Sequence, residues 1–262
     1  MQPMALCMNQ ILKHIHVSTK LLCVFIALFP ILGIAQDKYH LTAVLSPSFE
    51  KISDRNIGQS LPLEWKPSYH FGFEYKGFLD PDLSITLGIH FQNKGFRTRP
   101  RVMSTPGIID EERKGHIIIS ARYLTIPVGF DKHFKLADRT YLLASAAVHG
   151  GILINQTFSG KRFDAPDEIE DPLFKNAINR RDNIDWFKRE YFAWSAGVGI
   201  VQYIKAKLVI SVQPMYQRQL NDNIDPDGPV IGTDKPRFDA FYLNLKAGYY
   251  FNKQIKNYKK AL

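Results

Sequence analysis

Apolar and polar residues alternate with a period of two in eight separate segments of this chain. The last segment shows the pattern best, with apolar residues at odd positions from Phe241 to Phe251 and mostly polar, small or tyrosine residues between them. Such alternation places one face of a β-strand in apolar surroundings and the other face in different ones. The pattern predicts strands over about residues 39–49, 68–78, 83–96, 116–130, 140–154, 191–202, 208–217 and 238–251.

The connections between these segments alternate between short and long. Leu79–Asp82, Lys135–Asp138 and Tyr203–Lys207 are short, whereas the longest connection runs from about residue 155 to residue 189. An even number of strands with all short turns on one side is typical of bacterial outer-membrane barrels, whose short turns face the periplasm. The sequence therefore predicts an all-β fold, an eight-stranded antiparallel transmembrane up-and-down β-barrel with short periplasmic turns and long extracellular loops.

The first part of the chain has the features of a secretory signal peptide. Lys13 and Lys20 precede an apolar run, and the small residues of Gly33–Ala35 suit a signal peptidase. The run of about 14 residues is shorter than the ~20 that a membrane-spanning helix needs. We predict a signal peptide over residues 1–35 and an outer-membrane β-barrel domain over residues 36–262, with strands over about 39–251 and a basic tail over 252–262.

Charge and cysteine content narrow the class of protein further. The 262 residues carry a net charge of +9, and both cysteines, Cys7 and Cys23, lie in the predicted signal peptide. The exported chain therefore needs no disulfide. Its basic residues are scattered over connections and interleaved with acidic ones, which favours contact with anionic lipid or sugar phosphates over nucleic acid. We expect outer-membrane lipid as a partner, with another envelope protein or a surface glycan as further partners, and no cofactor.

Two segments carry motifs beyond the general alternation. One is the strand 83–96, which ends in Lys94-Gly95-Phe96, and the other is Ala121–Phe130 with its Tyr-Leu-Thr-Ile-Pro motif, followed by a strand that begins Tyr141-Leu142. These segments resemble the PorT-like family of small outer-membrane β-barrel proteins. The resemblance implies an eight-stranded barrel in the outer membrane and mostly uncharacterised roles, with some members serving protein secretion or gliding machinery. The chain departs from the family at Ala144–Ala147, where Gly and Pro are common, and in its tail after Phe251.

Two polar connections are candidates for ligand binding. The first is basic and suits the phosphates of outer-leaflet lipid; it contains Arg97, Arg99, Arg101, Arg113 and Lys114. The second places oxygen ligands at alternate positions, as at the start of a calcium loop, through Asn223, Asp225 and Asp227, with Asp234 further on. Two prolines interrupt this pattern and no helices flank it, so a solvated turn explains it better and we predict no metal site.

His90, His116 and His149 are the strand histidines that a lipid-modifying enzyme would use together with a nearby serine. Ser145 shares a face with His149, and Ser120 with His116, but each pair is four residues apart, which is about 13 Å along a strand. A pair formed across two strands cannot be read from the sequence. We therefore predict no catalytic residues and no enzymatic activity.

These observations favour a non-enzymatic outer-membrane barrel that acts through its extracellular loops as an interaction, assembly or secretion-accessory component. A narrow porin-like channel is an alternative, because residues such as Lys246 would charge the lumen. A lipid-modifying barrel enzyme and a soluble lipocalin-like binder are further alternatives. Alternation alone does not tell whether the apolar face points inward or outward, but the loop asymmetry and the polar opposite face favour outward.

Overall fold

The computed structural model describes residues 38–53, 63–98, 102–105, 108–110, 116–161, 181–183, 187–204, 207–222 and 237–252. The predicted signal peptide, residues 1–35, lies outside these ranges, and so does the chain after residue 252. No helix in the described part of the chain is long and apolar enough to cross a membrane.

Eight long strands build the fold. They are β1 (Lys38–Ser53), β3 (Lys66–Asp80), β4 (Leu83–Thr98), β7 (His116–Ala137), β8 (Thr140–Lys161), β10 (Glu190–Ile204), β11 (Leu208–Gln219) and β12 (Arg237–Asn252). The described residues also form four short strands, β2 (Leu63–Glu64), β5 (Val102–Thr105), β6 (Ile108–Asp110) and β9 (Arg181–Asn183). All eight predicted strands are therefore confirmed, each at least as long as the alternation indicates.

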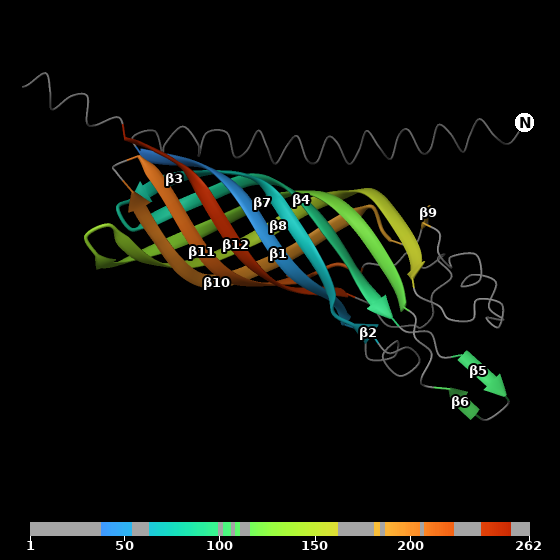
Figure 1. Ribbon diagram of the computed structural model, residues 1–262. Coiled ribbons are helices and arrows are strands. Elements are labelled where there is room, and N and C mark those ends of the chain that lie inside the picture. Colours follow the sequence, from blue (N-terminus) through green and yellow to red (C-terminus); the bar gives the residue numbers. More distant parts are fainter. Residues whose placement is uncertain are drawn as a thin grey trace, which may run out of the picture.

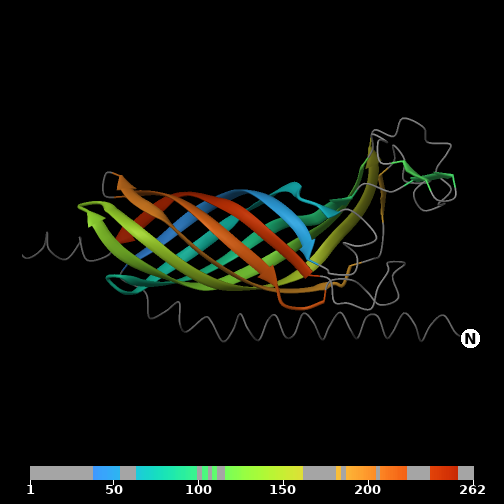
Figure 2. The same ribbon diagram turned by 90° about the horizontal axis from the view of Figure 1, so that it is seen from below.

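The eight long strands form a closed antiparallel barrel (Figure 1, Figure 2). Each pairs with the next long strand along the chain, and β12 pairs with β1 from Lys38↔Asn252 to Ser53↔Arg237. Closure satisfies the backbone hydrogen-bonding groups that an open sheet would leave at its edges. The predicted eight-stranded up-and-down topology is correct.

β7 and β8 are longer than their alternation indicates, and the turn between them lies at Asp138–Arg139 rather than at Lys135–Asp138. The alternation predicts an end of the strand at about Phe130. Asp131 and His133 nevertheless continue the strand, since both face the lumen and find polar partners there.

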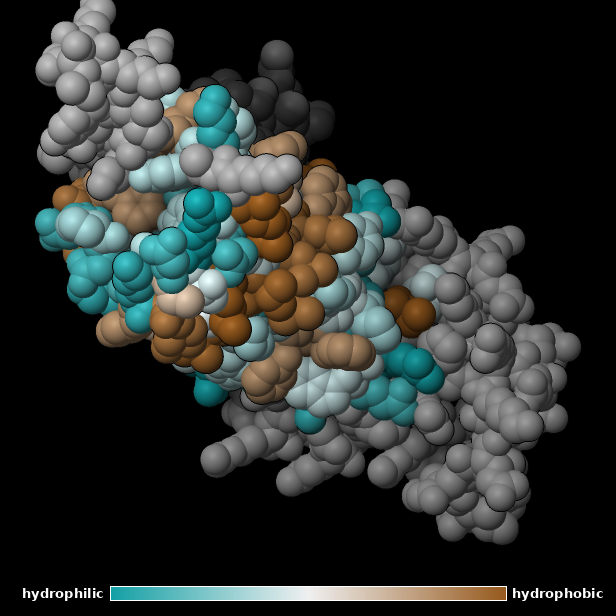
Figure 3. All heavy atoms as spheres, turned by 60° about the vertical axis from the view of Figure 1, so that its left-hand side comes forward, coloured by the Kyte–Doolittle hydropathy of each residue, from teal (hydrophilic) through white to brown (hydrophobic). Residues whose placement is uncertain are grey.

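The outer face of the barrel carries many large apolar side chains, and Figure 3 shows a band of them on one side. Its large exposed side chains include Leu45 at 55%, Phe73 at 66% and Val198 at 57% of their accessible surface. On β7 the outward polar residues within this surface are Arg122 and Lys132, and the exposed Phe134 and Leu136 continue the surface beyond Lys132. The ten residues from Arg122 to Lys132 span about 25 Å along the barrel axis at a rise of ~3.3 Å per residue and a tilt of about 40°, which is the height of the apolar belt of an outer-membrane barrel.

The inner face of the barrel is polar. The residues at the alternate inward positions are buried, as Ser84, Thr86, His90 and Gln92 of β4 show. The buried polar and charged residues include His40, Thr42, Ser46, Glu50, His70, Glu74, Lys76, Ser84, Thr86, His90, Gln92, Lys94, Thr125, Asp131, His133, His149, Ser195, Gln213, Gln217, Asn244 and Lys246. The apolar face therefore points outward, and the soluble lipocalin-like arrangement, which would bury the apolar face, is excluded.

Candidate functional site

Buried titratable side chains gather in the lumen of the barrel. Aromatic rings fill the end of the lumen where the short turns lie. We call this set the aromatic cluster; it consists of His40, Phe78, His133, Tyr141, Tyr203 and Tyr250, from six different strands. The His40 ring lies 5.0 Å from the rings of Phe78 and Tyr250 and 5.5 Å from that of Tyr203. The rings contact one another in a closed circuit, so the aromatic cluster blocks this end of the lumen.

The turn that joins β3 to β4 lies at the same end, outside the aromatic cluster. There the exposed Asp82 accepts a hydrogen bond from Lys132 of β7. This hydrogen bond holds the pKa of the Asp82 carboxyl below its usual value, against the small effect of desolvation. The pair fixes the end of β4 against β7.

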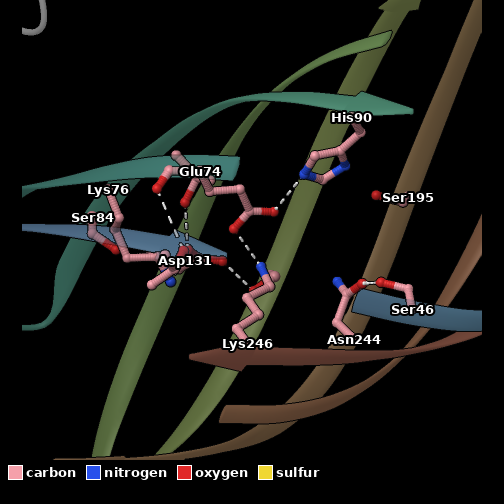
Figure 4. Close-up of polar contacts among 12 residues, drawn as sticks. Ser46, Glu74, Lys76, Ser84, His90, Asp131, Ser195, Asn244 and Lys246 are labelled. Carbon is pink, nitrogen blue, oxygen red and sulfur yellow. Dashed lines mark hydrogen bonds and ion pairs between the residues drawn. The ribbon is translucent and has the colours of Figure 1, made fainter. Parts of the chain in front are cut away.

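Glu74 of β3 lies in the middle of the lumen (Figure 4). Lys246 Nζ of β12 donates a hydrogen bond to its Oε2 at 2.6 Å, and His90 Nε2 of β4 lies 3.2 Å from its Oε1. All three side chains are less than a tenth exposed. A buried charge is tolerated when it is paired and hydrogen-bonded, so one carboxylate joins three strands here.

Asp131 of β7 organises a second polar group beside Glu74 (Figure 4). Its Oδ2 lies 2.6 Å from Lys76 Nζ and accepts a hydrogen bond from Thr86 Oγ1 at 2.7 Å. Ser145 of β8 donates to the other carboxylate oxygen. This acid therefore joins β3, β4, β7 and β8.

Glu50 of β1 forms a third group, nearer the end with the long connections. Lys94 Nζ lies 3.4 Å from its Oε2, and His70 Nε2 lies 2.8 Å from its Oε1. Lys94 also donates to Gln217 Oε1 at 2.6 Å. The side chains of Glu50 and Lys94 have no exposed surface, so neither charge has water as an alternative partner.

Beyond the Glu50 group, toward the end with the long connections, a cluster of buried apolar and aromatic side chains fills the lumen. We call this cluster the apolar cap; it consists of Ile52, Phe96, Ile119, Ala121, Tyr123, Phe187, Tyr191, Ala193 and Phe238. Phe187 precedes β10 and reaches inward, where its ring lies 5.6 Å from that of Phe238 and its backbone N–H donates to Gln156 Oε1 at 2.8 Å. The lumen is thus filled by the apolar cap at one end and by the aromatic cluster at the other.

Between the two ends lies a cavity of about 30 Å³, lined by residues such as Glu74, His149, Ser195, Gln213 and Lys246. A cavity of this size has room for about two water molecules and for no larger ligand. Both amide atoms of Gln213 and the Nδ1 atom of His149 lack a hydrogen-bond partner among the described residues. Water is the ligand that fits the volume and these polar atoms.

One pair in the cavity has the form of a nucleophile and a base. His149 Nε2 lies 2.8 Å from Ser195 Oγ, across the pairing of β8 with β10. A catalytic serine also needs a group that orients the histidine and a path for substrate. His149 Nδ1 has no partner among the described residues, and both side chains are at most 4% exposed. The pair therefore fits a structural hydrogen bond better than a catalytic one.

The structure places the predicted site residues as follows. His90 and His149 face the lumen, and Ser145 bonds to Asp131 rather than to His149. Arg97 Nε lies 3.0 Å from Glu64 Oε2, with about a third of each side chain exposed. Outside the described residues, or described only in their backbone, lie Arg99, Arg101, Arg113, Lys114, the calcium-loop residues Asn223, Asp225, Asp227 and Asp234, and the side chain of His116.

The sequence identifies which residues face the lumen, but it does not identify which of them contact one another. Ser195 lies at an inward position that the alternation of β10 identifies, but its pairing with His149 depends on the register between two strands. The same holds for Glu74 with Lys246, which are far apart in the chain. Within the described residues no group of three or more His, Cys, Asp or Glu side chains has an arrangement that could hold a metal ion.

Comparisons with known proteins agree with this geometry. The family model described as "Outer membrane protein beta-barrel domain" matches residues 34–225. A search among curated proteins found no match.

Several solved structures are similar to this chain in fold. One is Ail, the attachment invasion locus protein of Yersinia pestis, with 12% identity, a TM-score of 0.41 and coverage of 82% of this chain and 99% of that one. Another is OprG from Pseudomonas aeruginosa, with 8% identity, a TM-score of 0.45 and coverage of 82% and 96%. The outer membrane protease OmpT from Escherichia coli has 10% identity, a TM-score of 0.42 and coverage of 82% and 96%. At sequence identities this low, the similarity shows the fold alone.

The closed barrel, its apolar belt and the family match together locate this protein in the outer membrane. The chain belongs to the outer membrane protein beta-barrel domain family.

Proposed function

We propose that this protein is a non-enzymatic, non-conducting outer-membrane barrel that acts through its extracellular connections, as an interaction, assembly or secretion-accessory component. The observation that carries the proposal is the filled lumen. The aromatic cluster, the paired charges and the apolar cap occupy it from one end to the other. What remains for recognition is the outer rim, where the long connections begin and end.

The contacts inside the lumen argue against a porin-like channel and against a lipid-modifying enzyme. A charged lumen residue supports conduction when it faces a water-filled path, but Lys246 is buried and bonded to Glu74. An enzyme needs access for its substrate, whereas Ser195 and His149 lie beside a cavity of about 30 Å³. An eight-stranded barrel has an interior just wide enough for side chains, which agrees with both points.

The proposed partners follow from the outer rim and from the resemblance to the PorT-like family. Arg97, paired with Glu64, begins the basic connection that we propose contacts outer-leaflet phosphates. The motifs Lys94-Gly95-Phe96 and Tyr123–Pro127 support membership of the PorT-like group, and through it a role beside a secretion or gliding machine. Another envelope protein or a surface glycan is the partner that such a role requires.

Conductance in planar bilayers tests the non-conducting part. We expect no defined current steps from the purified protein. As a positive control, a porin with an open lumen, inserted by the same procedure, should produce steps. Regular steps from the unaltered protein would establish the channel and overturn the proposal.

Complementation of a deletion strain tests the role of the connections. Replacing residues 162–180 with a short Gly–Ser linker should abolish the function in cells while the barrel still inserts and shows heat-dependent mobility on gels. The matched variant His149→Gln, which changes the lumen only, should retain the function. If the histidine variant fails and the linker variant succeeds, the lumen is the functional site.

A further inference from the structure

Three charged side chains lie next to one another on the outer wall, at the end with the long connections. Lys51 of β1 is opposite Asp239 of β12, and Asp239 is opposite Arg218 of β11. The residues before and after each of them along its strand are buried, so all three side chains point outward. We call this set the charged row. Because neighbouring strands are about 4.8 Å apart, the backbone positions of the two cations are about 10 Å apart.

The charged row lies at the outer edge of the apolar surface. Toward the short turns, the outward residues of the same three strands carry no charge over Tyr39–Phe49 of β1, Leu208–Tyr216 of β11 and Phe241–Phe251 of β12. The ten residues from Phe241 to Phe251 span about 25 Å along the barrel axis, which is the height of the apolar belt. The charged row is therefore at the depth where the lipid head groups of the outer leaflet meet the barrel.

Aromatic rings border the charged row. We call this set the aromatic strip; it consists of Trp65, Phe241, Tyr216 and Trp194, and the centres of successive rings in this order are 5.7, 5.0 and 5.6 Å apart. Trp194 is directly opposite Arg218, at the level of the charged row. Tryptophan and tyrosine prefer the boundary between acyl chains and head groups. The aromatic strip therefore indicates the same depth independently of the charges.

The two cations of the charged row differ in how far their charge is already compensated. Asp239 Oδ1 accepts a hydrogen bond from the Tyr216 hydroxyl at 2.8 Å, and Arg218 Nε lies 3.8 Å from the same oxygen. Lys51 Nζ instead lies 5.9 Å from the centre of the Trp65 ring. Among the described residues Lys51 has no carboxylate partner. Its charge is therefore available to a ligand, as is the guanidinium of Arg218, whose side chain is 45% exposed.

Cations outnumber acids around the charged row. Arg237 is the next outward residue of β12 and lies diagonal to Lys51, and such diagonal neighbours are about 7–8 Å apart. It also lacks a carboxylate partner among the residues that the structure describes. Glu190 and Asp222 lie four residues beyond the level of the charged row, which is about 13 Å along a strand, and Glu64 already forms an ion pair. The local excess of positive charge suits an anion.

We propose that Lys51, Arg237 and Arg218 bind the phosphate of an anionic lipid in the outer leaflet. Lysine and arginine donate charge-assisted hydrogen bonds to phosphate oxygens, and their long side chains reach one phosphate from three neighbouring strands. The aromatic strip contacts the first part of the acyl chains. A lipid fits because its phosphate and its acyl chains meet at the depth where the cations meet the aromatic rings. The site requires the outer-membrane location, not the proposed role of the extracellular connections, and it is separate from the basic connection that begins at Arg97 of β4.

Quenching of tryptophan fluorescence tests which lipid lies at the site. Trp65 and Trp194 belong to the aromatic strip, and Trp186→Phe in every protein removes the third tryptophan. The full barrel is reconstituted into mixed vesicles of phosphatidylcholine and phosphatidylglycerol, with bromine on the acyl chains of first one lipid and then the other. Comparison of the two quenching curves gives the preference for the anionic lipid. We expect a preference of about threefold to tenfold at low salt, as one or two basic side chains near a membrane surface give. A preference near one would overturn the proposal. Quenching by neither lipid would show that a second copy of the chain covers the site, and would also overturn it.

Three double variants separate the site from the general charge of the barrel. Lys51→Gln with Arg237→Gln should bring the preference close to one, whereas Lys51→Arg with Arg237→Lys keeps both charges and should retain it. Lys135→Gln with Arg139→Gln removes two exposed cations at the opposite end of the barrel. This control should leave the preference unchanged, because lipid at that end is too far from the two tryptophans to quench them. Heat-dependent mobility on gels checks that each variant folds. Loss of the preference in the charge-keeping variant, or an equal loss in the variant at the opposite end, would contradict the assignment.

Inorganic phosphate distinguishes a lipid site from a site for the free ion. The quenching is repeated with millimolar inorganic phosphate and, as a control, with sodium chloride at the same ionic strength. Because free phosphate lacks the acyl chains that the aromatic strip contacts, we expect the same preference for the anionic lipid in both salts. A clearly lower preference in phosphate than in chloride would show that the free ion occupies the site, and would overturn the lipid as the ligand.

Discussion

The inner and outer walls of the barrel are made by the same strands, and β1 shows how differently the two are built. Its outward Leu41 and Phe49 are 52% and 57% exposed, whereas its inward His40 and Glu50 are at most 2% exposed. The outer wall needs apolar area and has no specific partners in the protein. The inner wall depends on named contacts, since each buried charge requires its counterpart. A substitution should therefore act through lipid contact on one wall and through a lost partner on the other.

The largest effect is expected where a buried ion pair is broken. Glu50→Ala leaves Lys94 buried without its carboxylate, which should destabilise the barrel by about 3–5 kcal/mol. Urea unfolding in lipid vesicles, followed by tryptophan fluorescence, measures the change. The double variant Glu50→Leu with Lys94→Met removes both charges and should recover most of the stability. A single variant as stable as the natural protein would show that the pair is not needed.

A charge placed on the outer wall should destabilise the barrel slightly less than a broken ion pair does. The loss of stability should depend on how deep in the membrane the charge lies. Leu45→Arg, in the middle of the belt on β1, should destabilise the barrel by about 2–4 kcal/mol, whereas Leu41→Arg near its edge should cost about 0–1 kcal/mol. The same unfolding assay compares them. Equal costs at the two positions would mean that the belt is placed wrongly along β1.

Glycines on the two walls provide a third comparison. A Cβ added at the inward Gly72 would lie 2.2 Å from the carbonyl oxygen of Ile89, but one at the outward Gly150 would have its nearest neighbour at 3.9 Å, on the Phe192 ring. Gly72→Ala should therefore destabilise by about 1–3 kcal/mol. Gly150→Ala should change stability by less than about 0.5 kcal/mol, as a substitution without a clash does. The reverse order would contradict the assigned faces of β3 and β8.

A small effect is also expected at the solvent-exposed rim. Arg97 and Glu64 form an ion pair with about a third of each side chain exposed. Because water competes for both charges, Arg97→Ala should cost no more than about 1 kcal/mol, and the cost should fall further in high salt. A cost equal to that of Glu50→Ala would show that the rim is packed like the lumen.

The inward and outward faces of the strands could largely be predicted from the sequence. The period of two assigned Leu87 and Ile89 to one wall of β4, and Thr86 and His90 to the other, because alternation is a local property of the strand. It failed at the end of β7, where Asp131 continues the strand as an inward residue with partners on other strands.

Predicting the contacts between side chains in the lumen requires the register between strands as well as the alternation along each strand. Ser195 and His149 meet because β8 pairs with β10, and Lys246 meets Glu74 although 172 positions separate them in the chain. Such contacts depend on how far each strand slides against its neighbour, which single-strand patterns do not specify. The aromatic cluster has the same origin, since its members come one from each of six strands.

The access of small reagents to the middle of the lumen tests the filled interior most directly. Ser195→Cys places a thiol beside the central cavity, and Asp138→Cys places one on the exposed turn after β7 as a control. A small charged thiol reagent is added to the folded barrel in vesicles, and modification is followed by mass spectrometry. We expect rapid modification at position 138 and none at position 195 until the barrel is unfolded. Rapid modification at position 195 in the folded protein would show an open lumen and contradict the filled interior.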